Sequence, residues 1–285
     1  MSRMLVLAVA VFLITGQYGE ASVLTNFDSF SVGSVNGQGG WVATGPYDQA
    51  VVDLGGGNKV WRVSNATTSG SFGDMPFSAP SGTPGGETTA LGAVTNTYYA
   101  SFDIWSSTGA AQPGLRLTVS PDAGNGQRQS FVAIADTGTG FDVTFFDYQT
   151  GPNDFVSTTI ATGLSYAGIH SIAFDMLFVD GNTPENDVVN VYVNGSLAHT
   201  GTSWEQFYPD VQPIDPSPFA IDTLLFRISA SPDFPAVPGL LGAGFYIDDV
   251  LITDVAPGAV PEPIALLTWA GLIGCAAVVS SRRQR

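Results

Sequence analysis

Short runs of alternating apolar and polar residues, separated by glycine- and asparagine-rich turns, most constrain what this chain can fold into. In one run, Ala100, Phe102 and Ile104 point to one side of a strand while Ser101 and Asp103 point to the other. Two further inward rows are Ile172, Phe174, Met176 and Phe178, and Leu224, Phe226 and Ile228 opposite Arg227. A sheet with one apolar face needs a second layer to cover it. These rows therefore predict two sheets around one core.

The turn-forming residues elsewhere in the chain favour many short strands over helices. A helical period is absent except for a turn around Trp204 to Phe207, and Asn194-Gly195 is a strong two-residue hairpin signal. The segments predicted as strands are Val23–Phe30, Ala50–Leu54, Val60–Ser64, Tyr98–Ser106, Leu115–Ser120, Ser130–Ala135, Phe141–Tyr148, Phe155–Ala161, Ser171–Val179, Val188–Val193, Ile221–Ser229 and Gly244–Thr253. We expect an all-β sandwich.

The N-terminus has the order of parts found in a secretory signal peptide. Arg3 precedes the apolar run Met4–Ile14, and a short polar stretch ends at the small residue Ala21. This order predicts a signal peptide over residues 1–21, cut before Ser22. A buried N-terminal helix is the alternative, but the apolar run has no polar face for solvent. We therefore expect the chain to be exported.

The C-terminus, residues 257–285, predicts a second membrane-directed segment. The uncharged run Ile264–Val279 predicts a transmembrane helix over 264–280. The residues that flank it are Pro261, Glu262 and Pro263 on one side and Arg282, Arg283 and Arg285 on the other. The arginines should stay on the cytoplasmic side, so that the domain faces outward. The prolines leave an extended peptide that suits a processing enzyme.

This tail resembles the PEP-CTERM sorting signal of bacteria, which has the same three parts in the same order. The resemblance implies that an exosortase-type enzyme recognises Pro261, Glu262, Pro263 and the arginine cluster, removes the tail and passes the protein to the cell envelope, cell surface or exterior. The inner-membrane anchor would then be transient. A permanent single-span anchor is the alternative.

Between these ends lies one domain, residues 22–256, whose charge excludes a class of ligands. It contains five basic residues against 23 acidic ones, a net charge of −18. Nucleic acids are not expected as partners, since phosphate binding needs a basic face. The single cysteine, Cys275, lies in the tail, so the exported domain has no disulfide and depends on its apolar core.

The domain also resembles the concanavalin A-like jelly-roll group, which includes laminin-G-type domains and many carbohydrate-binding modules. The residues that carry the resemblance are Phe27-Asp28-Ser29-Phe30, Gly37-Gln38-Gly39-Gly40-Trp41, the hairpin around Asn194-Gly195, and Gly244-Phe245-Tyr246-Ile247-Asp248-Asp249-Val250. The resemblance implies a jelly-roll β-sandwich in which the first and last strands lie close together. It further implies one structural calcium, held by Asp28 with Asp248 or Asp249. The loop Asp180, Asn182, Glu185 and Asp187 has ligand-like spacing as well.

No recognisable catalytic set emerges from the sequence, so we do not expect an enzyme. Jelly-roll glucanases carry Glu-x-Asp-x-x-Glu, and the nearest match begins at Glu185 but ends on Asn190. The two histidines, His170 and His199, lie on predicted strands, and no Gly-x-Ser-x-Gly elbow is present. A lyase site of the alginate-lyase kind would need Arg116 or Arg128 to neutralise its substrate.

Sugar binding would use aromatic faces, on which the apolar face of a sugar ring can stack. Trp41 and Trp61 are expected in the core. The aromatic residues least clearly assigned to the core are Tyr99, Trp105, Tyr148 and Trp204. We therefore predict a non-catalytic carbohydrate-binding or structural module that associates with extracellular polysaccharide. A glycoside hydrolase or lyase on the same fold, and a purely structural adhesin, are the alternatives.

Overall fold

The central domain of the chain is described by a computed structural model. The structure describes residues 22–68, 75–149, 155–181, 185–212, 218–228 and 235–256. The predicted signal peptide with Ala21 and the predicted sorting tail with Pro261, Glu262, Pro263 and its arginines lie outside the described residues. Across the described part of the chain, no helix is long and apolar enough to cross a membrane.

One layer of the domain is an antiparallel sheet of eight strands. In spatial order these are β13 (Ser196–Gly201), β12 (Val188–Val193), β11 (His170–Leu177), β6 (Thr97–Ser106), β15 (Phe245–Thr253), β4 (Asn58–Ser64) and β3 (Asp48–Gly55), with β1 (Ser22–Thr25) paired to β15. The pairing of β1 with β15 joins the first strand to the last, as the jelly-roll resemblance implied.

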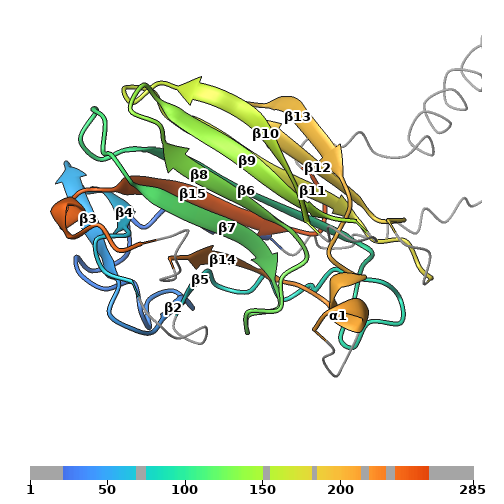
Figure 1. Cartoon of the computed structure of the whole chain (residues 1–285). Helices are drawn as coiled ribbons and strands as arrows, with labels where there is room; N and C mark the ends of the chain where they lie inside the picture. The colour runs from blue at the N-terminus through green and yellow to red at the C-terminus, as the bar shows by residue number, and fades with distance from the viewer. Residues whose placement is uncertain are drawn as a thin grey trace, which may run out of the picture.

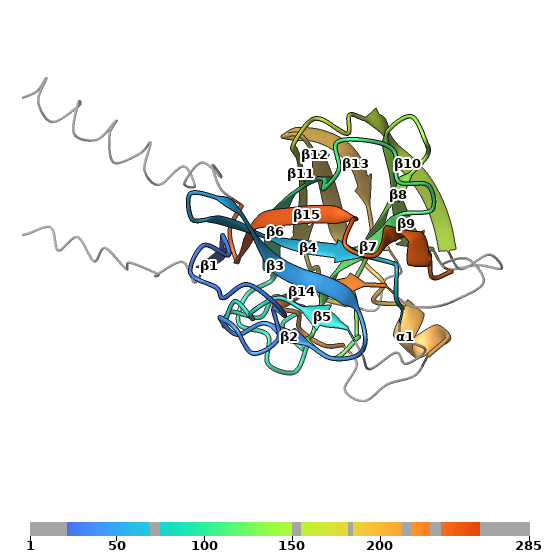
Figure 2. The same cartoon turned by 90° about the vertical axis from the view of Figure 1, so that its left-hand side faces the viewer.

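The second layer is an antiparallel sheet of seven strands. Its order is β10 (Phe155–Leu164), β9 (Phe141–Tyr148), β8 (Phe131–Asp136), β7 (Arg116–Asp122), β14 (Thr223–Arg227), β5 (Pro76–Phe77) and β2 (Val42–Ala43). Figure 1 looks onto this sheet, with the eight-stranded sheet behind it, and Figure 2 shows the domain from the side. The helices among the described residues are short: α1 (Phe207–Asp210) and the 3-10 turn η1 (Pro238–Leu240). The domain is thus a two-layer antiparallel β-sandwich, an arrangement consistent with a jelly roll.

The core lies between the two sheets and confirms the period-two prediction. All three inward rows are buried, including Phe102 of β6 at 1% exposure and Phe226 of β14 at 0%. The rings of these two residues meet across the layers with centroids 5.8 Å apart. Trp41 and Trp61 are fully buried beside them, as expected, with ring centroids 5.3 Å apart. The aromatic contacts join the sheets in a continuous apolar layer.

Local turns decide where elements begin and end. Asn194 and Gly195 have φ of 52° and 75°, which confirms the predicted two-residue hairpin between β12 and β13. The strand predicted over Val23–Phe30 ends at Thr25, because Phe27 takes a φ of 55° and its carbonyl accepts the Phe30 N–H. The predicted helical turn at Trp204 is there, but the helix α1 itself begins only at Phe207.

Candidate functional site

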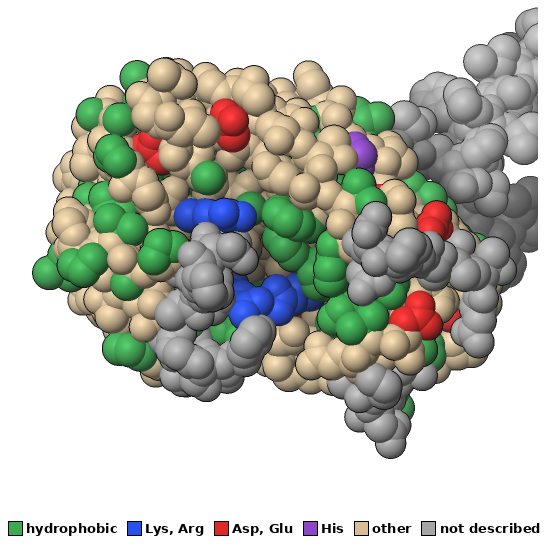
Figure 3. Space-filling model, viewed as in Figure 1, with side chains coloured by type: hydrophobic (Ala, Val, Ile, Leu, Met, Phe, Trp, Pro, Cys, Tyr) green, Lys and Arg blue, Asp and Glu red, His purple; other side chains and the backbone are tan. Residues whose placement is uncertain are grey.

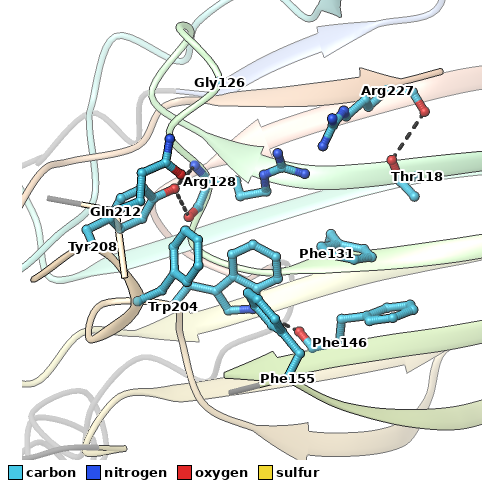
Figure 4. Close-up of a pocket in the computed structure, with 11 residues that line it drawn as sticks. Thr118, Gly126, Arg128, Phe131, Phe146, Phe155, Trp204, Tyr208, Gln212 and Arg227 are labelled. Carbon is cyan, nitrogen blue, oxygen red and sulfur yellow. Dashed lines mark hydrogen bonds between the residues drawn. The ribbon is translucent and has the colours of Figure 1, made fainter. Parts of the chain in front are cut away.

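A cavity of about 420 Å³ opens on the outer face of the seven-stranded sheet, next to α1. Its strand residues alternate with core residues, so the same period that builds the core places them on the solvent side. Figure 3 shows Lys and Arg side chains beside a hollow that also carries hydrophobic side chains. The lining residues are Thr118, Gly126, Arg128, Phe131, Phe146, Phe155, Trp204, Phe207, Tyr208, Gln212 and Arg227 (Figure 4). We call this cavity the outer pocket.

Aromatic rings form one wall of the outer pocket. Phe131 of β8 and Phe146 of β9 stack with ring centroids 4.3 Å apart. Phe155 at the start of β10 packs on Trp204 at 4.6 Å and on Phe207 at 5.2 Å. Phe155 is 39% exposed, whereas Trp204 is 4% exposed and donates its indole N–H to the Phe146 carbonyl at 3.0 Å. The accessible rings are therefore phenylalanines, supported from behind by the tryptophan.

Two arginines form the polar side of the outer pocket. Arg227 ends β14, and Arg128 lies in the connection between β7 and β8. The Tyr208 hydroxyl holds the Arg128 backbone, accepting its N–H at 2.7 Å and donating to its carbonyl at 2.8 Å. The Arg128 guanidinium lies 5.6 Å from the Trp204 ring centroid and 5.9 Å from that of Phe131. These cation–π contacts fix the guanidinium against the aromatic wall.

The electrostatics of the outer pocket follow from its partial burial. Burial lowers the pKa of Arg128, and burial together with the neighbouring Arg128 charge lowers the pKa of Arg227 to about 10. Both guanidiniums nevertheless remain charged at neutral pH. Burial also raises the pKa of the Tyr208 phenol, which stays neutral. The pocket thus combines an apolar wall with two guanidinium groups.

The groups of the outer pocket can bind a sugar ring. A sugar ring can stack on the exposed phenylalanine faces while guanidinium N–H groups donate to its oxygens. The described lining residues include neither a carboxylate nor an imidazole. Both histidines have other contacts: the His170 ring bonds the Ser165 carbonyl at 2.9 Å, and His199 packs on Phe145.

The structure places the four predicted sugar-binding aromatics on two faces of the sandwich. Trp204 lines the outer pocket, and Tyr148 packs behind it against Phe155 at 5.4 Å. Tyr99 and Trp105 lie instead on β6, on the outer face of the eight-stranded sheet, where Trp105 packs on Tyr246. The prediction missed Phe131, Phe146, Phe155 and Arg227 as pocket residues. The sequence feature that could have identified them is an aromatic or basic residue at an outward-facing position of an alternating strand.

The three acids predicted for calcium lie close enough to influence one another. Burial raises the pKa of Asp248 to about 6, and the charges of Asp249, Asp28 and Asp103 add to the rise. Asp103, which the sequence reasoning missed, stands directly opposite Asp248 in the β6–β15 pairing. The Asp28 carboxylate already accepts the Lys59 N–H at 2.9 Å. Within the described segments, no three carboxyl, imidazole or thiol groups are arranged to hold a metal ion. A structural calcium stays a prediction.

The second predicted ligand loop has its carboxylates engaged elsewhere. Asp180 accepts the backbone N–H and the hydroxyl of Thr88, at 2.7 and 2.6 Å. Asp187 is buried and accepts the Val179 N–H at 2.8 Å and the Ser203 hydroxyl. Asn182 lies outside the described residues.

A carboxyl pair that the sequence did not predict connects this loop to the segment before α1. The Glu205 carboxyl interacts with the carboxyls of two buried acids, Glu87 and Asp187. Burial and the interactions with Glu87 and Asp187 raise the pKa of Glu205 to about 9. Neither acid lines the outer pocket.

Comparison with known proteins gives no family assignment. No protein-family model and no curated protein sequence matches the chain. Among solved structures, an endo-β-1,4-glucuronan lyase from the fungus Trichoderma reesei is similar, with a TM-score of 0.43 and 11% identity over 82% of this chain and 95% of that one. The globular domain of T. cruzi calreticulin has a TM-score of 0.39 and 13% identity, over 93% and 100%. An alginate lyase from Pseudomonas aeruginosa has a TM-score of 0.41 and 12% identity, over 69% and 82%. Each TM-score is below 0.5, so these likenesses assign no function.

Proposed function

We propose that the domain is a non-catalytic carbohydrate-binding module of concanavalin A-like jelly-roll type, and that the outer pocket is its glycan site. The observation that carries the proposal is the pocket itself. Its volume of about 420 Å³ falls within the range of about 300–1,000 Å³ that ligand pockets occupy. Its wall of partly exposed phenylalanines and its guanidinium donors match the two requirements of sugar recognition, a stacking face and directed hydrogen bonds.

The test compares one aromatic on each face of the sandwich. Phe155→Ala removes the most exposed ring contact of the outer pocket, and Trp105→Ala removes an aromatic from the opposite face. Binding to an array of extracellular polysaccharides should fall about tenfold or more in Phe155→Ala, because stacked aromatics contribute much of such interfaces, and should be unchanged in Trp105→Ala. Circular dichroism and thermal melting of both variants control for folding.

The reverse pattern would move the glycan site to the outer face of the eight-stranded sheet. Wild-type protein that binds no glycan would contradict the proposal and favour a purely structural adhesin. Turnover of a bound polymer, seen as new reducing ends or unsaturated products, would favour a hydrolase or lyase instead.

We further propose that the module is exported and sorted through its tail, to act at the cell envelope, cell surface or exterior. The support is the order of parts in residues 1–21 and 257–285. The intact mass of the protein from its host tests this: a mass ending near Pro261–Pro263 supports processing by an exosortase-type enzyme, and a full tail through Arg285 means a permanent anchor. Normal processing of Glu262→Ala would contradict the role of the Pro-Glu-Pro segment.

A further inference from the structure

A second cavity of about 500 Å³ lies next to β2, β5 and the start of β14. Thr223 of β14 lines this second cavity, and Arg227, at the other end of the same strand, lines the outer pocket. Residues at an even spacing on a strand share one face of the sheet. Both cavities therefore open on the outer face of the seven-stranded sheet. At about 3.3 Å per residue, roughly 13 Å of β14 separates these two residues.

One turn of the chain forms an edge of both cavities. The connection from β7 to β8 contributes Gly124 and Asn125 to the second cavity and Gly126 to the outer pocket. In the view of Figure 1, β2 and β5 lie on one side of this connection and α1 lies on the other. The fully buried Asp122 holds the turn, because its Oδ1 atom accepts the Asn125 and Gly126 N–H groups at 3.0 Å each. The turn is thus a preformed edge between the two cavities.

The second cavity has the two features that sugar recognition requires, an apolar face and a polar group. The apolar face comes from Phe77 of β5, which pairs in register with Val42 of β2, a residue that is 49% exposed. The polar group comes from Asp222, a partly buried residue whose carboxyl has a pKa raised by burial. Among the described residues, no hydrogen bond to the Asp222 carboxyl is found. The carboxyl can therefore accept a hydrogen bond from a sugar hydroxyl.

The charge of the second cavity limits which sugar units can enter it. Asp222 is the only charged residue among the described lining residues. The domain around it, residues 22–256, contains five basic residues against 23 acidic ones. A sugar unit with a carboxylate or sulfate group would be repelled by this charge. An uncharged unit would instead donate a hydroxyl to the Asp222 carboxylate, and hydrogen bonds to ionised groups are the strong ones.

We propose that the glycan site continues over the turn into the second cavity, and that its ligand is an uncharged polysaccharide bound along several sugar units. The separation along β14 is longer than one sugar ring, so a ligand that reaches both cavities has to be a chain. This inference rests on the proposed function, since it adds a subsite to the outer pocket and names the class of glycan that the enlarged site binds.

The test measures how affinity depends on chain length. Isothermal titration calorimetry compares the disaccharide with the hexasaccharide of three uncharged series: β-1,4-linked glucose, β-1,4-linked mannose and β-1,3-linked glucose. In at least one series, the hexasaccharide should bind about tenfold or more tightly than the disaccharide, because it adds an apolar contact and a hydrogen bond to a carboxylate. Phe155→Ala, in the outer pocket, should weaken binding of both lengths.

Variants of the second cavity connect the gain in affinity to this place. Asp222→Ala should bring the hexasaccharide to within about threefold of the disaccharide and leave disaccharide binding unchanged. Phe77→Leu, which keeps an apolar side chain but removes the flat ring, should lose part of the gain. Asp175→Ala is the matched control, since Asp175 is also a partly buried acid but belongs to β11 of the other sheet, and it should keep the full gain. Thermal melting shows whether each variant is folded.

The outcomes separate this inference from the function on which it rests. Equal binding of disaccharide and hexasaccharide, still weakened in Phe155→Ala, would overturn the second subsite and leave the glycan site in place. A full gain in folded Asp222→Ala and Phe77→Leu would mean that the chain leaves the outer pocket by another route. Tighter binding of a polyuronate than of any uncharged chain would overturn the class of ligand. A wild type that binds no glycan would remove both proposals.

Discussion

Arg62 and Asp48 form a buried bidentate ion pair that ties β4 to β3. Arg62 Nη1 and Nη2 donate to the Asp48 carboxylate at 2.8 and 2.6 Å, and the two side chains are only 10% and 7% exposed. The Ser64 hydroxyl and the Gly242 N–H complete the coordination of the carboxylate at 2.6 and 3.0 Å, and Arg62 also donates to the Ala243 carbonyl. The pair thereby fixes the loop before β15 to the edge of the eight-stranded sheet.

Loss of one partner of this pair should be costly. Arg62→Met leaves a buried carboxylate without its counter-charge, and we expect a loss of about 3–5 kcal/mol in the free energy of unfolding, measured by urea denaturation at pH 7. Replacing both partners, Arg62→Met with Asp48→Leu, should recover most of that loss. A loss below about 1 kcal/mol in the single variant would mean that the pair is effectively solvated.

Stability from this pair should also depend on pH in a defined direction. Burial opposes ionisation of Asp48, but hydrogen bonds from Arg62, Ser64 and Gly242 outweigh it and lower the pKa of the carboxyl below its ordinary value. The contribution of the ion pair to the free energy of unfolding is therefore fully present at pH values above the ordinary pKa of a carboxyl group. It is lost as the pH falls through the pKa of Asp48 in the folded state. Denaturation of Arg62→Met should show a weaker fall in stability below pH 4 than the wild type shows.

The Glu87–Glu205 pair predicts the opposite pH dependence on the alkaline side. The pKa of Glu205 is about 9 in the folded protein, so the folded state keeps a proton that the unfolded chain releases at lower pH. Stability should therefore fall as pH rises toward 9. Asp248 and Asp122, with pKa values raised to about 6 and about 7, also make stability fall with rising pH, but over a lower pH interval. The interval from pH 7.5 to 9 therefore reports mainly on Glu205.

Glu205→Gln should flatten the stability profile between pH 7.5 and 9, because the amide can donate to Glu87 without titrating. Urea denaturation at half-unit pH steps measures this. Glu185→Gln, at an exposed position, serves as the matched control and should keep the wild-type slope. An unchanged slope in Glu205→Gln would show that other groups carry the alkaline dependence.

Calcium should act on the carboxylates around Asp248 in β15. Asp248 carries a raised pKa because it is partly buried near Asp249, Asp28 and Asp103, and a divalent cation would offset that repulsion. We expect millimolar calcium to raise the melting temperature at pH 7.5 and a chelator to reverse it, with no response in Asp248→Asn. A melting temperature that ignores both additions would exclude a structural calcium at these acids.

The sequence alone determined the class of fold and the composition of its core. Alternation in rows such as Phe102 and Ile104 fixes which side chains face inward, because the side-chain period of a strand is two residues whatever its neighbours are. The hairpin at Asn194-Gly195 could also be predicted from local sequence, because few residues accept two positive φ angles in succession. The two-residue strands β2 and β5 could not, because they are too short to show a period.

Only part of the candidate site could be predicted from the sequence. Trp204 and Tyr148 were identified as aromatics outside the main core pattern, and both belong to the wall of the outer pocket or its support. Tyr99 and Trp105 satisfied the same criterion but lie on the other layer. Alternation assigns a residue to an outward face, yet it does not say which sheet or which neighbour that face will have.

Tertiary structure decided which outward residues meet. Arg227 approaches Arg128 because β14 pairs with β7, although long stretches of chain and several strands separate them in sequence. Strand order of this kind depends on pairing between strands that are distant in sequence. Closing the long loops between them costs conformational entropy, which is offset only when whole apolar faces come together. The sequence by itself therefore determined a two-layer acidic sandwich and predicts an export segment at each end, whereas the arginine pair and its aromatic wall exist only because the folded sheet brings distant strands side by side.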